Sequence, residues 1–416
     1  MPEQIVITAD RSWDGTADET GGPVEVLVED GKIKEVGTRV TRRADAGLVA
    51  LGDRTLLPGF IDCHVHSTIN PFDMLRPAAG QSPAQVALYG VTTLRTILDH
   101  GFTTVRDLAT VAADPVTVHL SEAVDAGDIV GPRMIVAPHL LAARGGHGDF
   151  SGLLDPGLGS ELGLLADGPD QIAGAVRREA RSGAKWIKFG ASGGFATPSD
   201  DPTQTTYSQE EMDALVATAR DLGLPCTPHA YGDESVRRAV RAGVRSIEHG
   251  NLASGRTLDL MRERGVFLVP TQFMVMDGVD HIDDDAYWTG KDPAERRKFT
   301  TYADRLRECA RILAASDVKI AFGTDIGMFP HAQGWREFTA LVGNGISPAR
   351  ALRAATSTAA ELLDRPDLGR LAAGCAADLI AMPADPLDRI EAVAGVDFVM
   401  TGGRVHRTPD VAQAGT

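Results

Sequence analysis

One pattern recurs through the middle of the chain and restricts its fold more than any other feature: an amphipathic helix, then a glycine, then a short apolar strand. Examples are RREARSGAKWIKFG, TARDLGLPCTPHA and RRAVRAGVRSIEHG. A glycine directly after a helix suits the left-handed conformation that often ends helices. Ser208 with Glu211 forms a capping box before one helix, and Ser347 followed by Pro348 predicts the start of another. The pattern therefore predicts a series of strand–helix units.

Eight short segments have the apolar content and the flanking residues of buried strands. Alternation of strands with helices favours a parallel sheet of class α/β, and eight such units favour a closed (β/α)8 TIM-like barrel. An open doubly wound sheet is the alternative, but no GxGxxG motif follows the first strand. The predicted strands are residues 59–63, 103–107, 133–137, 185–190, 225–229, 245–249, 266–270 and 319–324.

The two ends of the chain have a different pattern, in which apolar and polar residues alternate, as in VEVLVEDGKIKEVG. Alternation interrupted by turn pairs such as Asp30-Gly31 is typical of β-hairpins. Each end alone is too small to bury a sheet face. We therefore predict a small β-sandwich domain built from residues 1–58 and 374–416, and a barrel domain over residues 59–373. Two unrelated β additions are the alternative.

Charge and cysteine content exclude several classes of protein. The 416 residues carry 41 Lys and Arg against 57 Asp and Glu, a net charge of −16, which argues against nucleic-acid or anionic-membrane partners. No run reaches the ~18 apolar residues of a membrane span, and the first residues do not resemble a signal peptide. The four cysteines are scattered without a CxxC motif, which predicts reduced thiols in a cytoplasmic protein. The oligomeric state stays open, and a homo-oligomer is compatible with the sequence.

Residues that can bind a metal lie where the predicted barrel strands end, which is where barrel enzymes carry their active sites. His64 and His66 are two residues apart, so on an extended strand both imidazoles point to one side. Imidazole and carboxylate groups are the usual ligands of a catalytic divalent metal. The candidates at these positions are His64, His66, Lys188, His229, His249 and Asp325.

Lys188 needs a separate interpretation, because an ammonium group has no lone pair and repels a dication. Three interpretations remain from the residues alone. Lys188 is a carbamylated lysine whose new carboxylate bridges two metal ions, a cation that binds substrate, or a structural lysine. Lys185, three residues earlier, shows that lysines occur here without a special role.

The segments GFIDCHVH, IKFGASGG, HAYG, IEHG and GTD, in that order, resemble the amidohydrolase superfamily. More narrowly, they resemble its imidazolonepropionase-like and Xaa-Pro dipeptidase (prolidase-type) branch. The resemblance implies two divalent metal ions bridged by a carbamylated Lys188. His64, His66 and Asp325 would hold the more buried ion, and His229 and His249 the more exposed one. The histidine-rich set favours Zn²⁺, although Mn²⁺, Co²⁺ and Fe²⁺ also fit it.

The same resemblance implies a mechanism in which a metal-bridging hydroxide attacks a carbonyl group. Asp325 would take the proton of the hydroxide and deliver it to the leaving amine. Tyr231 would donate a hydrogen bond to the oxyanion, or else shape the pocket rim. His147, in the glycine-rich loop 145–149, would contact the substrate carbonyl or carboxylate, or else only order that loop.

Two further residues are candidates for binding substrate. Arg144 has the planar guanidinium that suits a substrate carboxylate, although a surface arginine in a salt bridge would look the same in sequence. His331 follows the last predicted strand and is a candidate for the substrate pocket.

The function predicted from these features is metal-dependent hydrolysis of an amide (C–N) bond in a small molecule. A dipeptide or an N-acyl amino acid is the favoured substrate. A carbamate, a urea or a cyclic amide is the alternative, because each presents a carbonyl group to the same nucleophile. A non-catalytic binding barrel would be expected to lack some metal ligands, and a lyase using a Schiff base on Lys188 would leave the histidines without a role.

Overall fold

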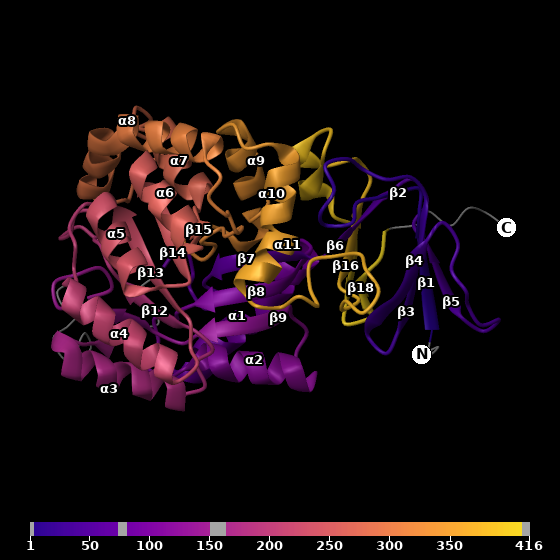
Figure 1. Cartoon of the computed structure of the whole chain (residues 1–416), viewed down its shortest axis with the longest axis horizontal. Coiled ribbons are helices and arrows are strands. Elements are labelled where there is room, and N and C mark those ends of the chain that lie inside the picture. The colour runs from indigo at the N-terminus through magenta and orange to yellow at the C-terminus, as the bar shows by residue number, and fades with distance from the viewer. Residues whose placement is uncertain (1–3, 74–80, 150–163, 410–416) are drawn as a thin grey trace.

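The computed structural model describes residues 4–73, 81–149 and 164–409. An α/β barrel and two antiparallel-rich sheets lie side by side along the long axis of the molecule (Figure 1). The barrel strands are β7 (Phe60–Val65), β8 (Phe102–Leu108), β9 (Arg133–Ala137), β10 (Leu140–Ala142), β11 (Leu164–Leu165), β12 (Ile187–Gly190), β13 (Cys226–Gly232), β14 (Ser246–Leu252) and β15 (Phe267–Val269).

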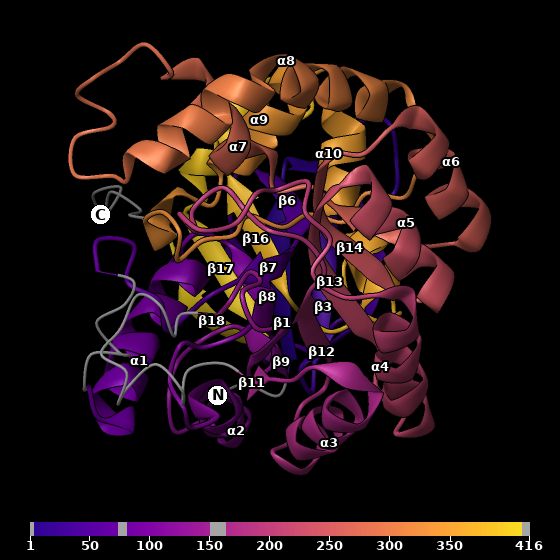
Figure 2. The ribbon, with the colours of Figure 1, turned by 90° about the vertical axis from the view of Figure 1, so that its left-hand side faces the viewer.

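Helices surround these strands, so that the strands are buried on both faces (Figure 2). Gly127, Gly243 and Gly265 end α2, α5 and α6 in the left-handed conformation, as the repeated pattern predicts. The helices are α1 (Pro83–Asp99), α2 (Val116–Ala126), α3 (Gly168–Arg181), α4 (Gln209–Asp221), α5 (Asp233–Ala242), α6 (Gly255–Arg264), α7 (Gln272–Asp280), α8 (Pro293–Ala315), α9 (Arg336–Gly343), α10 (Pro348–Ala354) and α11 (Ser357–Leu362).

The barrel strands pair in parallel, which confirms the predicted α/β class with a TIM-like barrel. Regular pairing forms two arcs, β7-β8-β9 and β11-β10-β12-β13-β14-β15, and not one continuous sheet. The two arcs meet at β9 and β10, which follow each other directly in the chain. Near this junction, the backbone N–H of Lys185, just before β12, donates to Val136 O of β9 at 2.8 Å.

The strand predicted over residues 319–324 is wrong as a regular strand. The segment 319–326 does occupy the eighth position: Leu268 N donates to Lys319 O, and Cys63 N donates to Phe322 O, at 2.9 and 2.8 Å. It makes only isolated bridges, at Ile320 and Ile326. Two of its N–H groups are used outside the barrel ladder: Phe322 N donates to Ala354 O at 2.9 Å, and Thr324 N donates to the Asp62 carboxylate at 3.1 Å.

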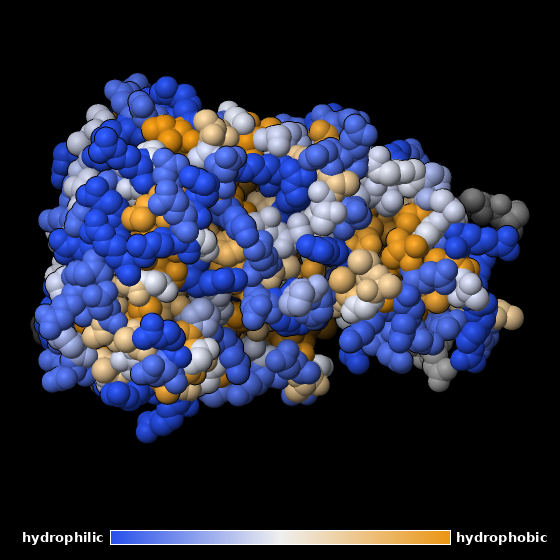
Figure 3. Space-filling view, viewed as in Figure 1, coloured by the Kyte–Doolittle hydropathy of each residue, from blue (hydrophilic) through white to orange (hydrophobic). Residues whose placement is uncertain are grey.

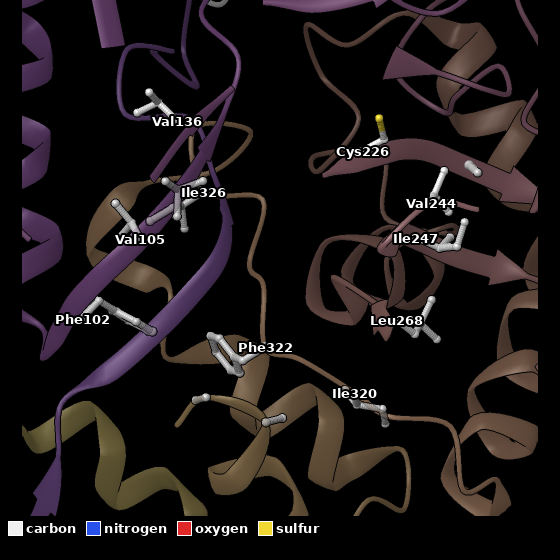
Figure 4. Close-up of a cluster of buried hydrophobic side chains, with 14 of the residues drawn as sticks. Phe102, Val105, Val136, Cys226, Val244, Ile247, Leu268, Ile320, Phe322 and Ile326 are labelled. Carbon is white, nitrogen blue, oxygen red and sulfur yellow. The ribbon is translucent and has the colours of Figure 1, made fainter. Parts of the chain in front are cut away.

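Apolar side chains from distant segments fill the barrel. Phe102 and Val105 of β8 lie near Phe322 and Ile326 of segment 319–326, and all four belong to one buried cluster (Figure 4). This contact explains why segment 319–326 keeps its place without regular strand pairing. Burial of this kind stabilises a fold by roughly 25 cal/mol per Å² of apolar surface.

Strands from both ends of the chain share one sheet of order β18-β17-β16-β6-β2, next to a second sheet of order β4-β3-β1-β5. One buried cluster joins the two sheets, with Ile7 and Val26 from the second and Leu56 and Phe398 from the first. The domain boundaries given above stay a prediction. The strands are β1 (Gln4–Ala9), β2 (Arg11–Ser12), β3 (Val24–Glu29), β4 (Lys32–Gly37), β5 (Gly47–Ala50), β6 (Thr55–Pro58), β16 (Leu379–Met382), β17 (Phe398–Thr401) and β18 (Arg404–Arg407).

The molecular face in Figure 3 is mainly hydrophilic, with apolar residues in separate areas. Among the helices in the described ranges, none combines the length and the apolar content that crossing a membrane requires.

Candidate functional site

Six side chains meet at the end of the barrel where the strands finish, as the sequence predicts. The ligand atoms of His64, His66 and Asp325 all lie within 4.8 Å of one another. Oδ1 of Asp325 is 3.2 Å from Nε2 of His66 and 3.4 Å from Nε2 of His64. These three residues come from the end of β7 and from segment 319–326, some 260 residues apart in the chain.

The imidazoles of His229 and His249 complete the group. Their ring centroids are 4.5 Å apart, and the ring of His249 is 5.1 Å from that of His64. Tyr231 stacks on His249 at 4.6 Å, and His147 stacks on His229 at 3.8 Å. Three strands (β7, β13 and β14) and one irregular segment thus place five predicted ligands close together, with Tyr231 from β13 and His147 from the loop after β10 beside them.

Hydrogen bonds behind the rings orient the predicted ligands. Nδ1 of His66 lies 2.9 Å from the carbonyl oxygen of Ala109, which only accepts hydrogen bonds. Nδ1 therefore carries a proton, and Nε2 faces Oδ1 of Asp325. Burial would lower the pKa of His66, but Asp325 outweighs it and raises that pKa, so a metal ion bound at Nε2 would displace a proton. Nδ1 of His249 is similarly held by Thr271 Oγ1 at 2.8 Å. Such outer contacts fix the ring orientation that a metal ligand needs.

Backbone conformations that side chains rarely adopt are concentrated at this site. Positive φ angles occur at Ala109 (115°), His249 (72°), Thr271 (45°) and Asp325 (64°), which are four of the six such non-glycine residues in the described ranges. Each costs of order 1–3 kcal/mol and persists only where the surroundings impose it. Two of the four are predicted ligands, and the other two bind the rings of predicted ligands.

Lys188 lies on β12 at the floor of the site and is 3% exposed. Its Nζ has no hydrogen-bond partner among the described residues. Burial lowers the pKa of this amine to about 8, although the charges of Glu248 and Asp325 oppose the shift. A buried amine without a hydrogen-bond partner lowers the stability of the fold. A group bound in the site would have to interact with this nitrogen.

The charge states of the other groups suit a metal ion. Burial lowers the pKa of His64, His229 and His249 well below the ordinary value, so their imidazoles are neutral and carry free lone pairs. Burial would raise the pKa of Asp325, but His64, His66 and Lys188 outweigh it and lower that pKa. Neutral imidazoles with one carboxylate are the donor set of a catalytic divalent metal site. The residues present therefore fit the metal that the sequence predicts.

Charged residues that the sequence motifs do not single out lie beneath these ligands. Glu248 is fully buried: its Oε2 lies 2.9 Å from Nδ1 of His64, and its Oε1 accepts from Arg106 at 2.6 Å. Asp62 accepts the N–H of His64 at 3.0 Å, and Asp107 accepts the N–H of Ser67 at 3.1 Å. The signal was present, because each is a charged residue inside a strand that the pattern marks as buried.

A cavity of about 920 Å³ opens above the predicted ligands. Its lining as a whole is largely apolar, and much of it comes from the segment after β12, from α7 and α8, and from the segment before α9. Cavities of this size with largely apolar walls are typical of small-molecule sites in proteins. Apolar residues of these walls include Phe195, Phe273, Met274, Phe299, Met328 and Phe329.

Two predicted substrate-binding residues do not reach this cavity. Arg144 pairs with Asp167 and is largely exposed, because Asp167 accepts both its guanidinium and its backbone N–H. This is the surface salt bridge that the sequence left as the alternative. His331 is buried behind the site, where its Nε2 lies 3.1 Å from the carbonyl oxygen of His66. Neither residue belongs to the described cavity lining, and His331 supports the backbone of a predicted ligand.

His147 and Tyr231, in contrast, both line the cavity. Tyr231 extends from β13, two residues beyond His229. Its backbone N–H donates to Ser192 Oγ at 2.9 Å, which ties β13 to the segment after β12. Both side chains stand where a molecule above the predicted metal ligands would meet them.

The sequence and the structure are both similar to those of known hydrolases. A model of the amidohydrolase family matches residues 55–406. Ochratoxinase from Aspergillus niger is 28% identical over 386 residues, which cover 86% of this chain and 77% of that protein. A crystal structure of ochratoxinase from A. niger has a TM-score of 0.85 at 25% identity and covers 99% of this chain and 97% of its own.

Two further crystal structures are similar over almost the full length. A Xaa-Pro dipeptidase with methionine bound in its active site has a TM-score of 0.86 at 30% identity and covers 97% of this chain and all of its own. A prolidase in complex with N-methylphosphonate-L-proline has a TM-score of 0.86 at 32% identity, with the same coverage of both chains.

Proposed function

The chain belongs to the amidohydrolase family, and on that premise we propose that it is a binuclear metal-dependent enzyme that hydrolyses the amide bond of a dipeptide or an N-acyl amino acid. A Xaa-Pro dipeptidase and a prolidase among its structural relatives support the reaction type. The substrate, the number of metal ions and the roles of individual residues are the proposal.

One observation carries the proposal: the buried Nζ of Lys188 has no partner among the described residues, in the midst of neutral imidazoles and a carboxylate. A free ammonium would be poorly satisfied there. A carbamate formed on the same nitrogen would carry two oxygen atoms toward His64, Asp325 and His249. The amine can react with carbon dioxide because its lowered pKa leaves part of it neutral near pH 7.

The residues divide naturally between two ions, which we propose to be Zn²⁺. His64, His66 and Asp325 would hold one, His229 and His249 the other, and the carbamate of Lys188 would lie between them. When bound, such ions polarise a carbonyl group and lower the pKa of water so that it attacks at neutral pH.

The chain's own residues supply proton transfer and orientation. The low pKa of Asp325 makes it a carboxylate that can accept the proton of the attacking water and return it to the leaving nitrogen. Tyr231 keeps its phenol protonated, because burial raises its pKa well above the ordinary value. It can therefore donate a hydrogen bond to the oxyanion. His147, beside His229, is placed to contact the carbonyl or carboxylate of the substrate.

The class of substrate is supported by the relatives and by the cavity. One structural relative is a Xaa-Pro dipeptidase and another is a prolidase, so dipeptides are the natural first candidates. A cavity of about 920 Å³ with largely apolar walls also leaves room for an acyl group larger than an amino acid.

A panel of small molecules tests the proposed function. The purified protein, loaded with Zn²⁺, should hydrolyse dipeptides or N-acyl amino acids when release of the free amino acid is followed by chromatography. Carbamates, ureas and lactams form the second half of the panel. If only carbamates, ureas or lactams are hydrolysed, those compounds are the substrate class and not dipeptides or N-acyl amino acids. If no compound of the panel is hydrolysed, the proposed function is wrong.

Replacing Tyr231 by phenylalanine should lower kcat/KM by about 10²–10³-fold, because a lost oxyanion donor costs ~2.7–4 kcal/mol in the transition state. The matched control is Tyr207→Phe, since Tyr207 is equally buried but donates its hydroxyl to Ala166 O at 3.0 Å, away from the described cavity lining. Tyr207→Phe should cost about 1 kcal/mol of stability and leave kcat/KM unchanged. Equal activity of Tyr231→Phe and wild type would assign Tyr231 to the cavity wall.

A further inference from the structure

A buried lysine on α8 ties a segment of the active site in place. Lys298 lies some 100 residues from that segment in sequence, and its ammonium makes three hydrogen bonds to it. The acceptors are Gly194 O at 2.8 Å, Asp200 Oδ1 at 3.1 Å, and the carbonyl oxygen of Thr197. An ammonium has three protons to donate, so all of them are used within residues 194–200.

The segment held by Lys298 fixes two imidazoles. A Cβ atom added to Gly194 would lie 2.7 Å from Nδ1 of His147 and 3.3 Å from Nε2 of His229, so the backbone here is in close contact with both rings. Nε2 of His229 also lies 3.2 Å from the carbonyl oxygen of Gly193. A movement of this backbone would therefore displace His147 from its stacked position on His229.

Asp200 links the lysine to His147. Its Oδ1 accepts from Lys298 and from the N–H of Gly194, both at 3.1 Å. Its Oδ2 lies 3.5 Å from Nδ1 of His147 and has no hydrogen-bond partner in the described part of the chain. If Oδ2 of Asp200 and Nδ1 of His147 came closer by less than about 0.5 Å, they would form a hydrogen bond of ordinary length. Thr197 Oγ1 reaches the same nitrogen at 3.2 Å.

Lys298 and Asp200 themselves stay out of the cavity. Both are buried, and neither belongs to its described lining, whereas His147 and Phe195 do. Burial would raise the pKa of Asp200, but His147, Gly194 and Lys298 together lower it, so the pair is an ion pair. Any effect on a bound molecule must therefore pass through another residue.

We propose that Lys298 and Asp200 are positioning residues that hold the imidazole of His147 against His229 and direct its other nitrogen toward the substrate. The proposal rests on the proposed function, in which His147 contacts the substrate. Asp200 holds the Nδ1 edge of the ring, and Lys298 both neutralises Asp200 and anchors the segment that carries it. α8 thereby acts on substrate binding through this pair as well as through Phe299, which lines the cavity directly.

A double-mutant cycle tests the proposal. Asp200→Asn keeps the size of the side chain and the oxygen that accepts from Lys298 and Gly194. It replaces the oxygen that faces Nδ1 of His147 with an NH2 group, which cannot accept a hydrogen bond. It should lower kcat/KM by about 10–100-fold, as losses of such supporting partners do. In the background of His147→Ala, the same substitution should change kcat/KM by less than about threefold, because the residue through which it acts is gone. Equal effects in both backgrounds would overturn the proposal.

Lys298→Met is the second variant, with Arg297→Met as its matched control. Arg297 is the preceding residue on α8 and is exposed, so its substitution removes the same charge without touching the segment. Lys298→Met should lower kcat/KM by about 10–100-fold at unchanged metal content, whereas Arg297→Met should not. Thermal unfolding of each variant identifies any loss of folded protein.

A crystal structure of Lys298→Met supplies a measurement that does not depend on turnover. The imidazole of His147 should leave its stacked position, in which its centroid is 3.8 Å from that of His229 in the intact chain. Retention of the stacked ring would overturn the positioning role. If the wild type hydrolyses no amide, the proposed function fails, and the position of His147 in this variant still decides whether the pair positions it.

Discussion

Replacing Asp325 by asparagine is expected to lower kcat by several orders of magnitude while the protein stays folded. The carboxylate lies 3.2 and 3.4 Å from the predicted ligands His66 and His64, and its pKa is low enough to keep it charged at neutral pH. A positioned general base alone contributes ~10²–10⁴-fold to a rate. Asparagine fills the same space, but its amide cannot accept a proton and is a weaker metal ligand. The measurement is kcat on whichever amide the wild type hydrolyses fastest.

The control for this prediction is Asp304→Asn, because Asp304 is fully exposed on α8 and its loss removes the same charge. It should leave kcat unchanged. The fold of Asp325→Asn should survive, because the backbone N–H of residue 325 still donates to His64 O at 2.7 Å. Turnover of Asp325→Asn within about threefold of wild type would remove Asp325 from the chemistry.

The predicted ligands could be found from the sequence because two rules act together. Strand–helix repeats place strand ends at one rim, and barrel enzymes use that rim for chemistry. His64, Lys188, His229 and His249 all follow from these rules, since each lies within or at the end of a predicted apolar strand. Asp325 could be predicted at the same rim, although its strand is irregular, because it directly follows the apolar segment 319–324.

The supporting residues could not be found in the same way, because their partners are distant in sequence. Arg106 and Glu248 are 142 positions apart, and Lys298 and Asp200 are 98 apart, so neither ion pair has a local pattern. Charged residues inside apolar strands were a usable signal for the first pair. Lys298 had none, because a lysine on an amphipathic helix is ordinarily exposed.

Arg144 and segment 319–326 show two other reasons why a structure cannot be fully predicted from sequence patterns. Whether an arginine faces a cavity or a surface carboxylate depends on Asp167, a residue beyond a segment that the structure does not describe. Segment 319–326 has the apolar residues of a strand, but two of its N–H groups donate outside the barrel ladder, one of them to the side chain of Asp62. Side chains that replace backbone partners leave no periodic trace in a sequence.

Lys188→Met is the second substitution expected to have a very large effect, and it separates the three interpretations of this lysine. If a carbamate on Lys188 joins two ions, the variant should lose at least one of about two divalent ions per chain, and kcat should fall by several orders of magnitude. The measurements are metal content by plasma spectrometry and kcat. The stability of the metal-free protein should not fall, because Nζ makes no hydrogen bond within the described residues and methionine suits a buried position.

The neighbouring lysine gives the control, since Lys185 is exposed and Lys185→Met should change neither metal content nor kcat. Full metal content with an increased KM would make Lys188 a substrate-binding cation, and a lower melting temperature with normal kcat would make it structural. Carbamylation also predicts that the wild type, stripped of metal and reloaded, recovers activity faster with bicarbonate than without it. At a constant concentration of dissolved carbon dioxide, the rate should rise as pH increases through about 8, because carbon dioxide reacts only with the neutral amine, whose fraction increases as pH passes that pKa. Recovery that is independent of both bicarbonate and pH would exclude the carbamate.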